Sequence, residues 1–327
     1  MGSRRKAEKL DERQSHSDSE FLLMQSFAIV LLLISAVMHA GWNAFGKHRV
    51  PTMAFFLVAS AGGTLLLSPV LVWVPSVVRS ITDYDLALVM TAGFFEAIYL
   101  GSLAAAYRTG ELSIAYPVAR AMPAVFVAGV SVSVGYHAEA ITAGYWPGAG
   151  LIVVGSLLIP LRSFRALRLS AYAHPGFVFA VCAALGTTGY AIVDDTALSR
   201  LRSANPEVDP VLVTLVYACL QAGFTGCWLS VAVVVRRGPR RELTEILREG
   251  PIVPMLTGGW ITVTYGFVLL AMAFADNVSY IVAFRQISIP IGVGMGIVLL
   301  REPAGFAKLV GTGVLAAGVI LVAVAGS

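Results

Sequence analysis

Residues 211–235 read VLVTLVYACLQAGFTGCWLSVAVVV and contain no Asp, Glu, Lys or Arg. A helix needs about 20 predominantly apolar residues to cross the roughly 30 Å hydrocarbon core of a bilayer. This stretch is long enough, and none of its side chains carries a charge that water would have to solvate. It therefore predicts a membrane-spanning helix.

Similar apolar runs fill almost the whole chain. Of the 327 residues, 57% are hydrophobic and only 13% are charged, and the mean hydropathy is +0.79. Because a soluble domain carries about 25% charged residues, this chain has too few charges to cover a water-soluble surface. We expect an all-α membrane protein with about ten transmembrane helices. The runs are Phe21–Phe45, Met53–Val74, Leu86–Tyr107, Leu112–Val134, Ile141–Leu161, Gly176–Leu198, Val211–Val235, Ile252–Ala275, Val278–Leu300 and Ala304–Ala325.

The ten runs fall into two sets of five, which predicts an internal duplication. When the chain is shifted by 166 residues, Gly93 aligns with Gly259 and Tyr99 with Tyr265, without a gap between them. An odd number of spans in each half gives the halves opposite orientations, which is the inverted repeat of many secondary transporters. The predicted organisation is a polar N-terminal tail at 1–20, a first five-helix repeat at 21–165 and a second at 166–327.

Short motifs recur in order along the two halves. They are HAGWN at 39–43 with Lys47, GELSIAYPVAR at 110–120, GYAIVD at 189–194, and AFRQIS at 283–288 followed by LREP at 300–303. On these motifs the chain resembles the EamA-type ten-helix transporters of the drug/metabolite transporter superfamily, over nearly all its length after residue 20. The resemblance implies metabolite transport, mostly export, by alternating access. One position departs from it, because Gln286 stands where many members of this branch have an acidic residue.

Two arginines lie inside apolar runs, where a charge costs about 2.5–3.5 kcal/mol on insertion scales and is usually paired or functional. Arg120 shares a helix face with Tyr116, and Pro117 is expected to open that helix by removing a backbone donor. Arg285 and Gln286 occupy the corresponding region of the second half. Two arginines facing one cavity would bind an anionic or zwitterionic solute.

Carboxylates inside the runs are candidates for proton coupling. Glu96 lies in the third run with Tyr99 one turn later, and Asp194 and Asp195 lie near the end of the sixth. Glu96 and Asp194 are the candidate proton carriers, since a buried carboxylate can take up a proton near neutral pH. Asp195 is expected at the membrane interface. The alternative for Glu96 is a structural ion pair with Arg120.

Polar and aromatic residues of two motifs complete the predicted site. His39 and Asn43 share a helix face with Trp42 beside them, and Tyr190 occupies the matching motif of the second half. These residues could line a cavity with hydrogen bonds and a stacking surface. The alternative is hydrogen bonding between helices together with an interfacial Trp anchor.

Other classes of function are weighed against transport. An intramembrane lipid-modifying enzyme could use Asp194, Asp195 and Arg200, but the chain has no H-E-x-x-H or G-x-S-x-G motif. A channel, and an exporter of cationic drugs, are further alternatives. We expect no enzyme activity, no cofactor, no nucleic acid and no metal. Asp83-Tyr84-Asp85 begins a span and is interpreted as helix capping.

The expected partners are a small-molecule solute and the lipid bilayer, with the chain as a monomer or homodimer. The expected location is the bacterial inner membrane, as a multi-pass protein. Loop charges conflict on orientation. Most basic residues lie in odd-numbered loops such as 236–250, which places both termini outside, whereas the basic tail and the family resemblance place the termini in the cytoplasm.

Overall fold

Helices make up nearly all of the described chain. A computed structural model describes residues 26–41, 51–109, 112–161, 175–275, 277–299 and 301–326, with the backbone alone for 112–117, and these ranges contain no β-strand. The helices are Ser26–Gly41, α2 (Met53–Leu67), α3 (Pro69–Trp73), α4 (Pro75–Ser80), α5 (Asp83–Arg108), α6 (Leu112–Val134), α7 (Tyr145–Leu158), α8 (Pro175–Ala204), α9 (Pro210–Val235), α10 (Arg237–Glu249), α11 (Ile252–Ala271), α12 (Val278–Phe284), α13 (Ser288–Val298) and α14 (Phe306–Ala325).

Seven helical segments of the described chain are long and apolar enough to cross a bilayer. They are Met53–Trp73, Asp83–Arg108, Pro175–Ala204, Pro210–Val235, Ile252–Ala271, Val278–Val298 and Phe306–Ala325. Three shorter apolar helices accompany them, at Ser26–Gly41, Val118–Val134 and Tyr145–Leu158. The all-helical class is therefore confirmed for the described residues, with seven candidate spans.

Local sequence signals determine where several helices begin. The Thr52 hydroxyl accepts a hydrogen bond from the Phe55 amide at the start of α2. Asp209 caps α9, whose first residue, Pro210, has no N–H group to satisfy. The Asn277 side chain caps α12 in the same way. Each cap pairs a backbone amide that the helix itself cannot satisfy.

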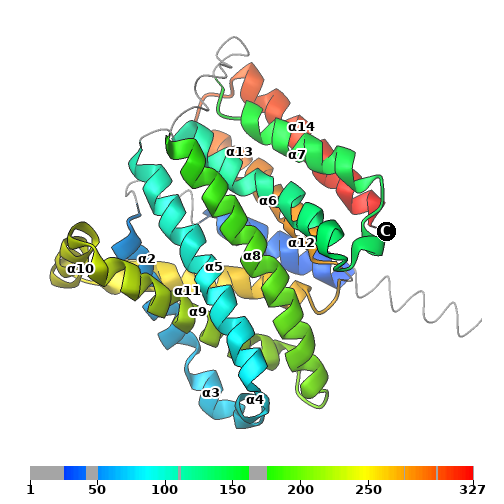
Figure 1. The fold of residues 1–327 in the computed structure, drawn as a ribbon. Coiled ribbons are helices and arrows are strands. Elements are labelled where there is room, and N and C mark those ends of the chain that lie inside the picture. The colour runs from blue at the N-terminus through cyan, green and yellow to red at the C-terminus, as the bar shows by residue number, and fades with distance from the viewer. Residues whose placement is uncertain are drawn as a thin grey trace, which may run out of the picture.

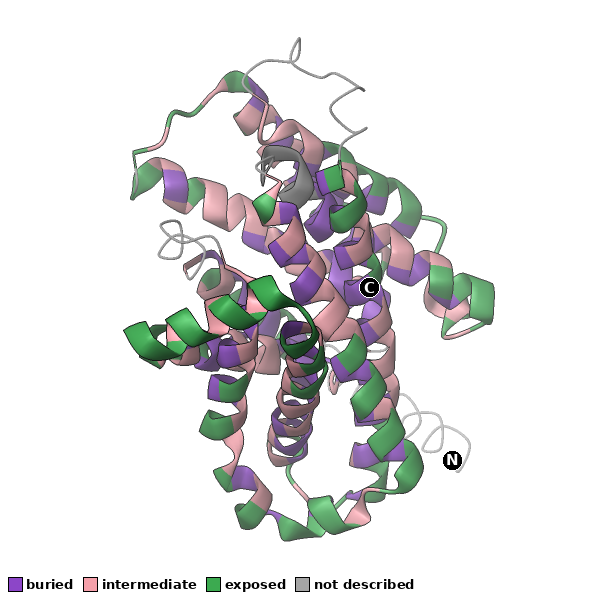
Figure 2. Ribbon diagram, turned by 60° about the vertical axis from the view of Figure 1, so that its left-hand side comes forward, coloured by how far each residue is buried: buried purple, intermediate pink, exposed green. Residues whose placement is uncertain are grey.

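The helices pack against one another in pairs and bury the faces between them. α5 and α8 run side by side, as do α7 and α14 (Figure 1). α2 packs on α11 and α9, and α6 packs on α8 and α7. Buried residues gather on the faces that the helices turn toward one another (Figure 2). The outward faces are rich in exposed large apolar side chains, as expected where a protein meets lipid.

Glycines allow the closest of these contacts. A Cβ atom at Gly258 of α11 would overlap the backbone carbonyl of Ala59 in α2. A Cβ atom at Gly318 of α14 would lie 2.7 Å from the carbonyl oxygen of Gly148 in α7. Small residues of this kind let helix backbones approach in a membrane, where lipid removes the hydrophobic driving force between helices.

The structure departs from the sequence expectations at two places. The link Arg236–Gly250, expected to be a polar connection, contains the helix α10, which has no buried residue and packs on α2 and α9. The fourth run was expected to open at Pro117, but α6 is continuous from Leu112 to Val134. The helix that breaks is the ninth run, where a 3₁₀ turn at Arg285–Ile287 separates α12 from α13.

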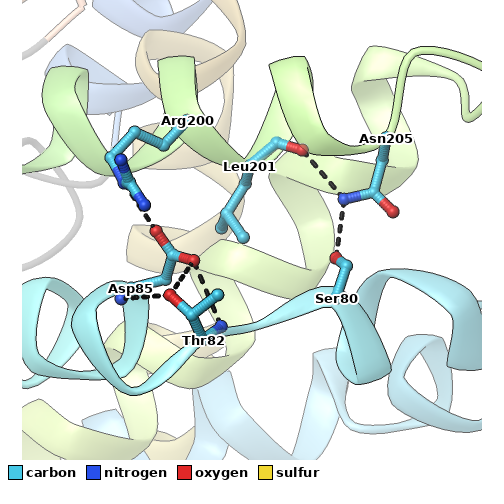
Figure 3. Close-up of polar contacts among 6 residues, drawn as sticks. All are labelled: Ser80, Thr82, Asp85, Arg200, Leu201 and Asn205. Atoms are coloured by element: carbon cyan, nitrogen blue, oxygen red, sulfur yellow. Dashed lines mark hydrogen bonds and ion pairs between the residues drawn. The ribbon is translucent and has the colours of Figure 1, made fainter.

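The start of α5 is joined to the end of α8 by polar contacts (Figure 3). Asp85 and Thr82 form a capping box, which confirms the capping role expected for this segment. Arg200 donates a hydrogen bond of 2.7 Å to the other oxygen of Asp85. Asn205 of the segment after α8 donates one of 2.7 Å to the Ser80 hydroxyl. These bonds hold α4 and α5 against α8.

We expect Gly258→Ala to destabilise the protein because the added methyl group overlaps the α2 backbone. Overpacking of this kind costs about 1–3 kcal/mol, and it should appear as a lower melting temperature of the purified protein. Gly266→Ala is the matched control on the same helix, since a Cβ atom there meets no other atom within 4 Å. Equal melting temperatures for the two variants would contradict the close approach of α2 and α11.

Candidate functional site

A cavity lies among the helix Ser26–Gly41, α2, α5, α6, α8, α11 and the junction of α12 with α13. It contains about 720 Å³ of empty space, its open mouth included. Its wall includes His39, Glu96, Arg120 and Arg285, together with three tyrosines. Residues from both halves of the chain therefore surround one space.

Arg120 is anchored across the two halves of the chain. Its side chain is 9% exposed, and its Nη2 atom donates a hydrogen bond of 2.7 Å to the Ser288 hydroxyl oxygen. Ser288 in turn donates one of 2.9 Å to the carbonyl oxygen of Arg285. The guanidinium is thereby held in the cavity wall by a neutral group, and its charge is available to a solute.

Arg285 reaches the cavity from the 3₁₀ turn between α12 and α13. Its guanidinium carbon lies 5.0 Å from the centroid of the Tyr265 ring. A cation above an aromatic face is attracted by the ring quadrupole. Tyr265 thus supports Arg285 without neutralising it.

Three tyrosines form a continuous aromatic surface in the cavity. The ring centroids of Tyr99 and Tyr190 are 6.0 Å apart, and those of Tyr190 and Tyr265 are 5.5 Å apart, in edge-to-face arrangements. Such pairs are favourable beyond the area that they bury. The surface joins α5, α8 and α11, and could pack against the apolar part of a solute.

Glu96 is paired with a neutral partner. Its Oε2 atom accepts a hydrogen bond of 2.8 Å from the Thr225 hydroxyl of α9. The ion pairs of the described residues are Arg108–Glu242, Arg200–Asp85, Arg241–Glu245 and Lys308–Glu302. The ion pair between Glu96 and Arg120 that the sequence left open is thus absent from this part of the chain.

Asp194 lies beside the cavity and is fully buried. Tyr217 and Gln221 donate hydrogen bonds of 2.6 and 2.9 Å to its Oδ1 atom. Tyr265 donates one of 2.5 Å to Oδ2. A carboxylate offers only acceptors, so three donors around it satisfy a charge that lipid could not. Tyr265 thereby contacts both this carboxylate and Arg285.

The other predicted residues are distributed as follows. His39 and Tyr190 line the cavity. Gln286 lines a smaller adjoining pocket together with Arg120 and Arg285. Asp195, expected at the interface, is half-buried and accepts a hydrogen bond of 2.7 Å from Tyr136. Trp42, Asn43 and the side chain of Tyr116 lie outside the described residues.

Three residues of the site were not predicted as site residues, namely Tyr265, Ser288 and Thr225. Tyr265 could have been found, because it aligns with Tyr99 in the internal repeat. Ser288 closes the motif AFRQIS, one helical turn after Arg285. Thr225 has no comparable signal, since its role depends on how α9 is rotated against α5.

Comparisons with known proteins identify the fold and no function. No protein-family profile matches the chain, and no curated protein does. Among solved structures 26 chains match. One of them, described only as "Crystal structure of protein", has a TM-score of 0.61 and 15% sequence identity. The match covers 94% of this chain and 97% of that one. At this identity the similarity concerns the fold alone.

We expect Asp194→Asn to destabilise the protein because the amide has one acceptor oxygen for three donors, so a buried N–H or O–H group is left unpaired however Tyr265 turns its hydroxyl. An unsatisfied buried polar group costs about 1–3 kcal/mol, and the loss should be measurable as a lower melting temperature. Asp195→Asn is the neighbouring control, since Asp195 is half-buried and has the Tyr136 hydroxyl as its partner. A loss for Asp195→Asn that equals or exceeds the loss for Asp194→Asn would refute this account.

Proposed function

We propose that the chain is a secondary transporter of the EamA type within the drug/metabolite transporter superfamily, and that it moves a small anionic or zwitterionic solute by alternating access. One observation carries the proposal. Arg120 and Arg285, from different halves of an apolar helical protein, line the same cavity, and the described residues give neither an ion-pair partner. Buried charges are normally paired, so a cationic cavity wall is explained by a solute that supplies the negative charge.

The proposed architecture is ten spans in two inverted five-helix repeats. The seven long segments and the three shorter apolar helices together correspond to the ten apolar runs. The aligned residues Tyr99 and Tyr265 both line the cavity. The aligned glycines also make matching contacts, because Gly93 packs on Phe224 of α9, while Gly259 packs on Leu66 of α2. α2 and α9 correspond to the second apolar runs of their halves, which supports a shared ancestry of the two halves.

Proton coupling through Glu96 is part of the proposal. Glu96 is the carboxylic side chain of the main cavity wall, and the Thr225 hydroxyl is its hydrogen-bond partner. A carboxyl group so placed can gain or lose a proton without breaking an ion pair. Its position near a bound solute would let protonation and solute binding influence each other.

Export of cationic drugs is the second candidate, favoured by the three tyrosines and Glu96. An aromatic surface with one carboxylate suits a cation. The two arginines oppose it, because they would repel the same cation at short range. An anionic or zwitterionic solute uses all of these groups, so we prefer it.

We expect Arg120→Ala and Arg285→Ala to weaken saturable transport of anionic solutes by proteoliposomes that contain the purified protein, with half-saturation at a higher solute concentration. Hydrogen bonds to charged groups contribute about 1.5–3 kcal/mol, so each variant should bind such a solute at least roughly tenfold more weakly. Binding is read from the rise in melting temperature that a ligand of the folded state produces. Transport is read from counterflow, which a simple channel does not show.

Arg241→Ala is the matched control, because Arg241 is an exposed arginine that pairs with Glu245 on α10. It should leave binding and counterflow unchanged. Stabilisation of the wild-type protein by cationic or apolar compounds alone would overturn the proposal. It would assign the arginines a structural role and favour drug export.

We expect Glu96→Gln to abolish transport driven by a pH gradient while counterflow of the solute persists. The glutamine keeps a hydrogen-bond acceptor for Thr225 but cannot carry a proton. Glu139→Gln serves as the control, since Glu139 is exposed outside the long helices. Intact pH-driven transport in Glu96→Gln would eliminate Glu96 as the proton carrier.

A further inference from the structure

A smaller pocket adjoins the main cavity and has a distinct wall. It shares Arg120 and Arg285 with the cavity, and two of the tyrosines. Its own wall adds Thr187, Gln286 and three apolar residues, around about 250 Å³ of empty space. We call it the side pocket. The four shared residues place this pocket next to a solute bound in the main cavity.

Two buried polar atoms of the side pocket lack a hydrogen-bond partner in the described structure. One is Nε of Arg120, a donor, and the other is Oε1 of Gln286, an acceptor. Gln286 is 4% exposed, and its Nε2 atom donates a hydrogen bond of 3.0 Å to the carbonyl oxygen of Val282. That carbonyl can only accept, so the amide orientation is determined and Oε1 is the end left over. The residues of the pocket wall therefore contain one unpaired donor and one unpaired acceptor.

The charge of the side pocket restricts which donor can pair with Gln286. The charged residues in its wall are Arg120 and Arg285, whereas Glu96 lines the main cavity and not this pocket. An ammonium group here would face two cations with no carboxylate in the wall. A neutral hydroxyl pairs with the same acceptor without that repulsion.

We propose that the side pocket binds an end group in which an anionic oxygen stands next to a neutral O–H donor. A 2-hydroxycarboxylate has this chemistry, and so does a singly protonated phosphoryl group. The anionic oxygen accepts from Arg120 and Arg285, and the hydroxyl donates to Oε1 of Gln286. A plain carboxylate would leave the glutamine oxygen unpaired. The proposal rests on the proposed transport function and narrows its substrate class.

The test compares probes of matched shape by thermal shift with the purified full-length protein. Lactate, propionate and alanine share a three-carbon skeleton and differ in the group beside the carboxylate. Lactate should bind roughly tenfold more tightly than propionate or alanine, because it alone pairs the buried acceptor without adding charge. Methylphosphonate, below its second ionisation, should likewise bind more tightly than methanesulfonate, which has no hydroxyl.

Two variants assign the preference to Gln286. Gln286→Leu removes the acceptor, so lactate and propionate should then bind equally. Gln286→Glu adds a negative charge, and preference should move from lactate toward alanine. A folding defect would weaken the binding of every solute, whereas these variants are expected to change which solute binds most tightly. Melting temperatures without solute check that both variants are folded.

The outcomes separate this proposal from the transport function. If lactate and propionate bind the wild-type protein equally, and Arg120→Ala weakens the binding of both, the transport proposal stands and the side-pocket proposal is wrong. Tightest binding of alanine would overturn it as well. If only methylphosphonate binds more tightly than its partner methanesulfonate, the proposal is supported with a phosphoryl end group. If only lactate binds more tightly than propionate and alanine, it is supported with a 2-hydroxycarboxylate end group. If no anion binds, both proposals fail.

Discussion

The hydrogen-bonding needs of polar groups buried among apolar helices determine the arrangement of the site. Lipid supplies no partners, so each such group must be satisfied within the protein or face a cavity. Asp194 follows the first route, with donors from Tyr217, Gln221 and Tyr265. Arg120 follows the second, with one bond to Ser288 and an Nε atom that remains unpaired. Asp194 thus has its hydrogen-bond partners within the protein, whereas Arg120 keeps a donor without one, and the proton-carrier role of Asp194 stays a prediction.

The 3₁₀ turn at Arg285–Ile287 follows from the same constraint. It interrupts an otherwise continuous span at the depth where Arg285 and Ser288 enter the cavity. Irregular backbone is tolerated within a membrane where it is buried in protein or lines a cavity. The turn also brings a serine to Arg120 and an arginine to Tyr265, so a single break organises contacts with α6 and α11.

The helical class could be predicted because long apolar runs without charged residues are typical of membrane-spanning helices. A shared cavity for Arg120 and Arg285 was also expected, because each is a charge inside an apolar run, and both line the same cavity. The partner of Glu96 was not, because a choice between Arg120 and Thr225 depends on helix rotation and depth, which no local pattern records. The helix α10 was not predicted, because its charged residues indicated a polar connection. The roles of Trp42 and Asn43 stay predictions.

The glycine contact between α2 and α11 also limits how the molecule can deform. Backbones that touch at Gly258 cannot slide past each other without separating, and Gly186 brings α8 close to the backbone of α5 at Tyr99. Tyr265 on α11 and Tyr99 on α5 place the cavity between the two pairs. The hydrogen bond from Tyr265 to Asp194 of α8 joins one pair to the other, and α9 packs on both α2 and α5. A rotation of one pair against the other would therefore have to break that bond and repack α9.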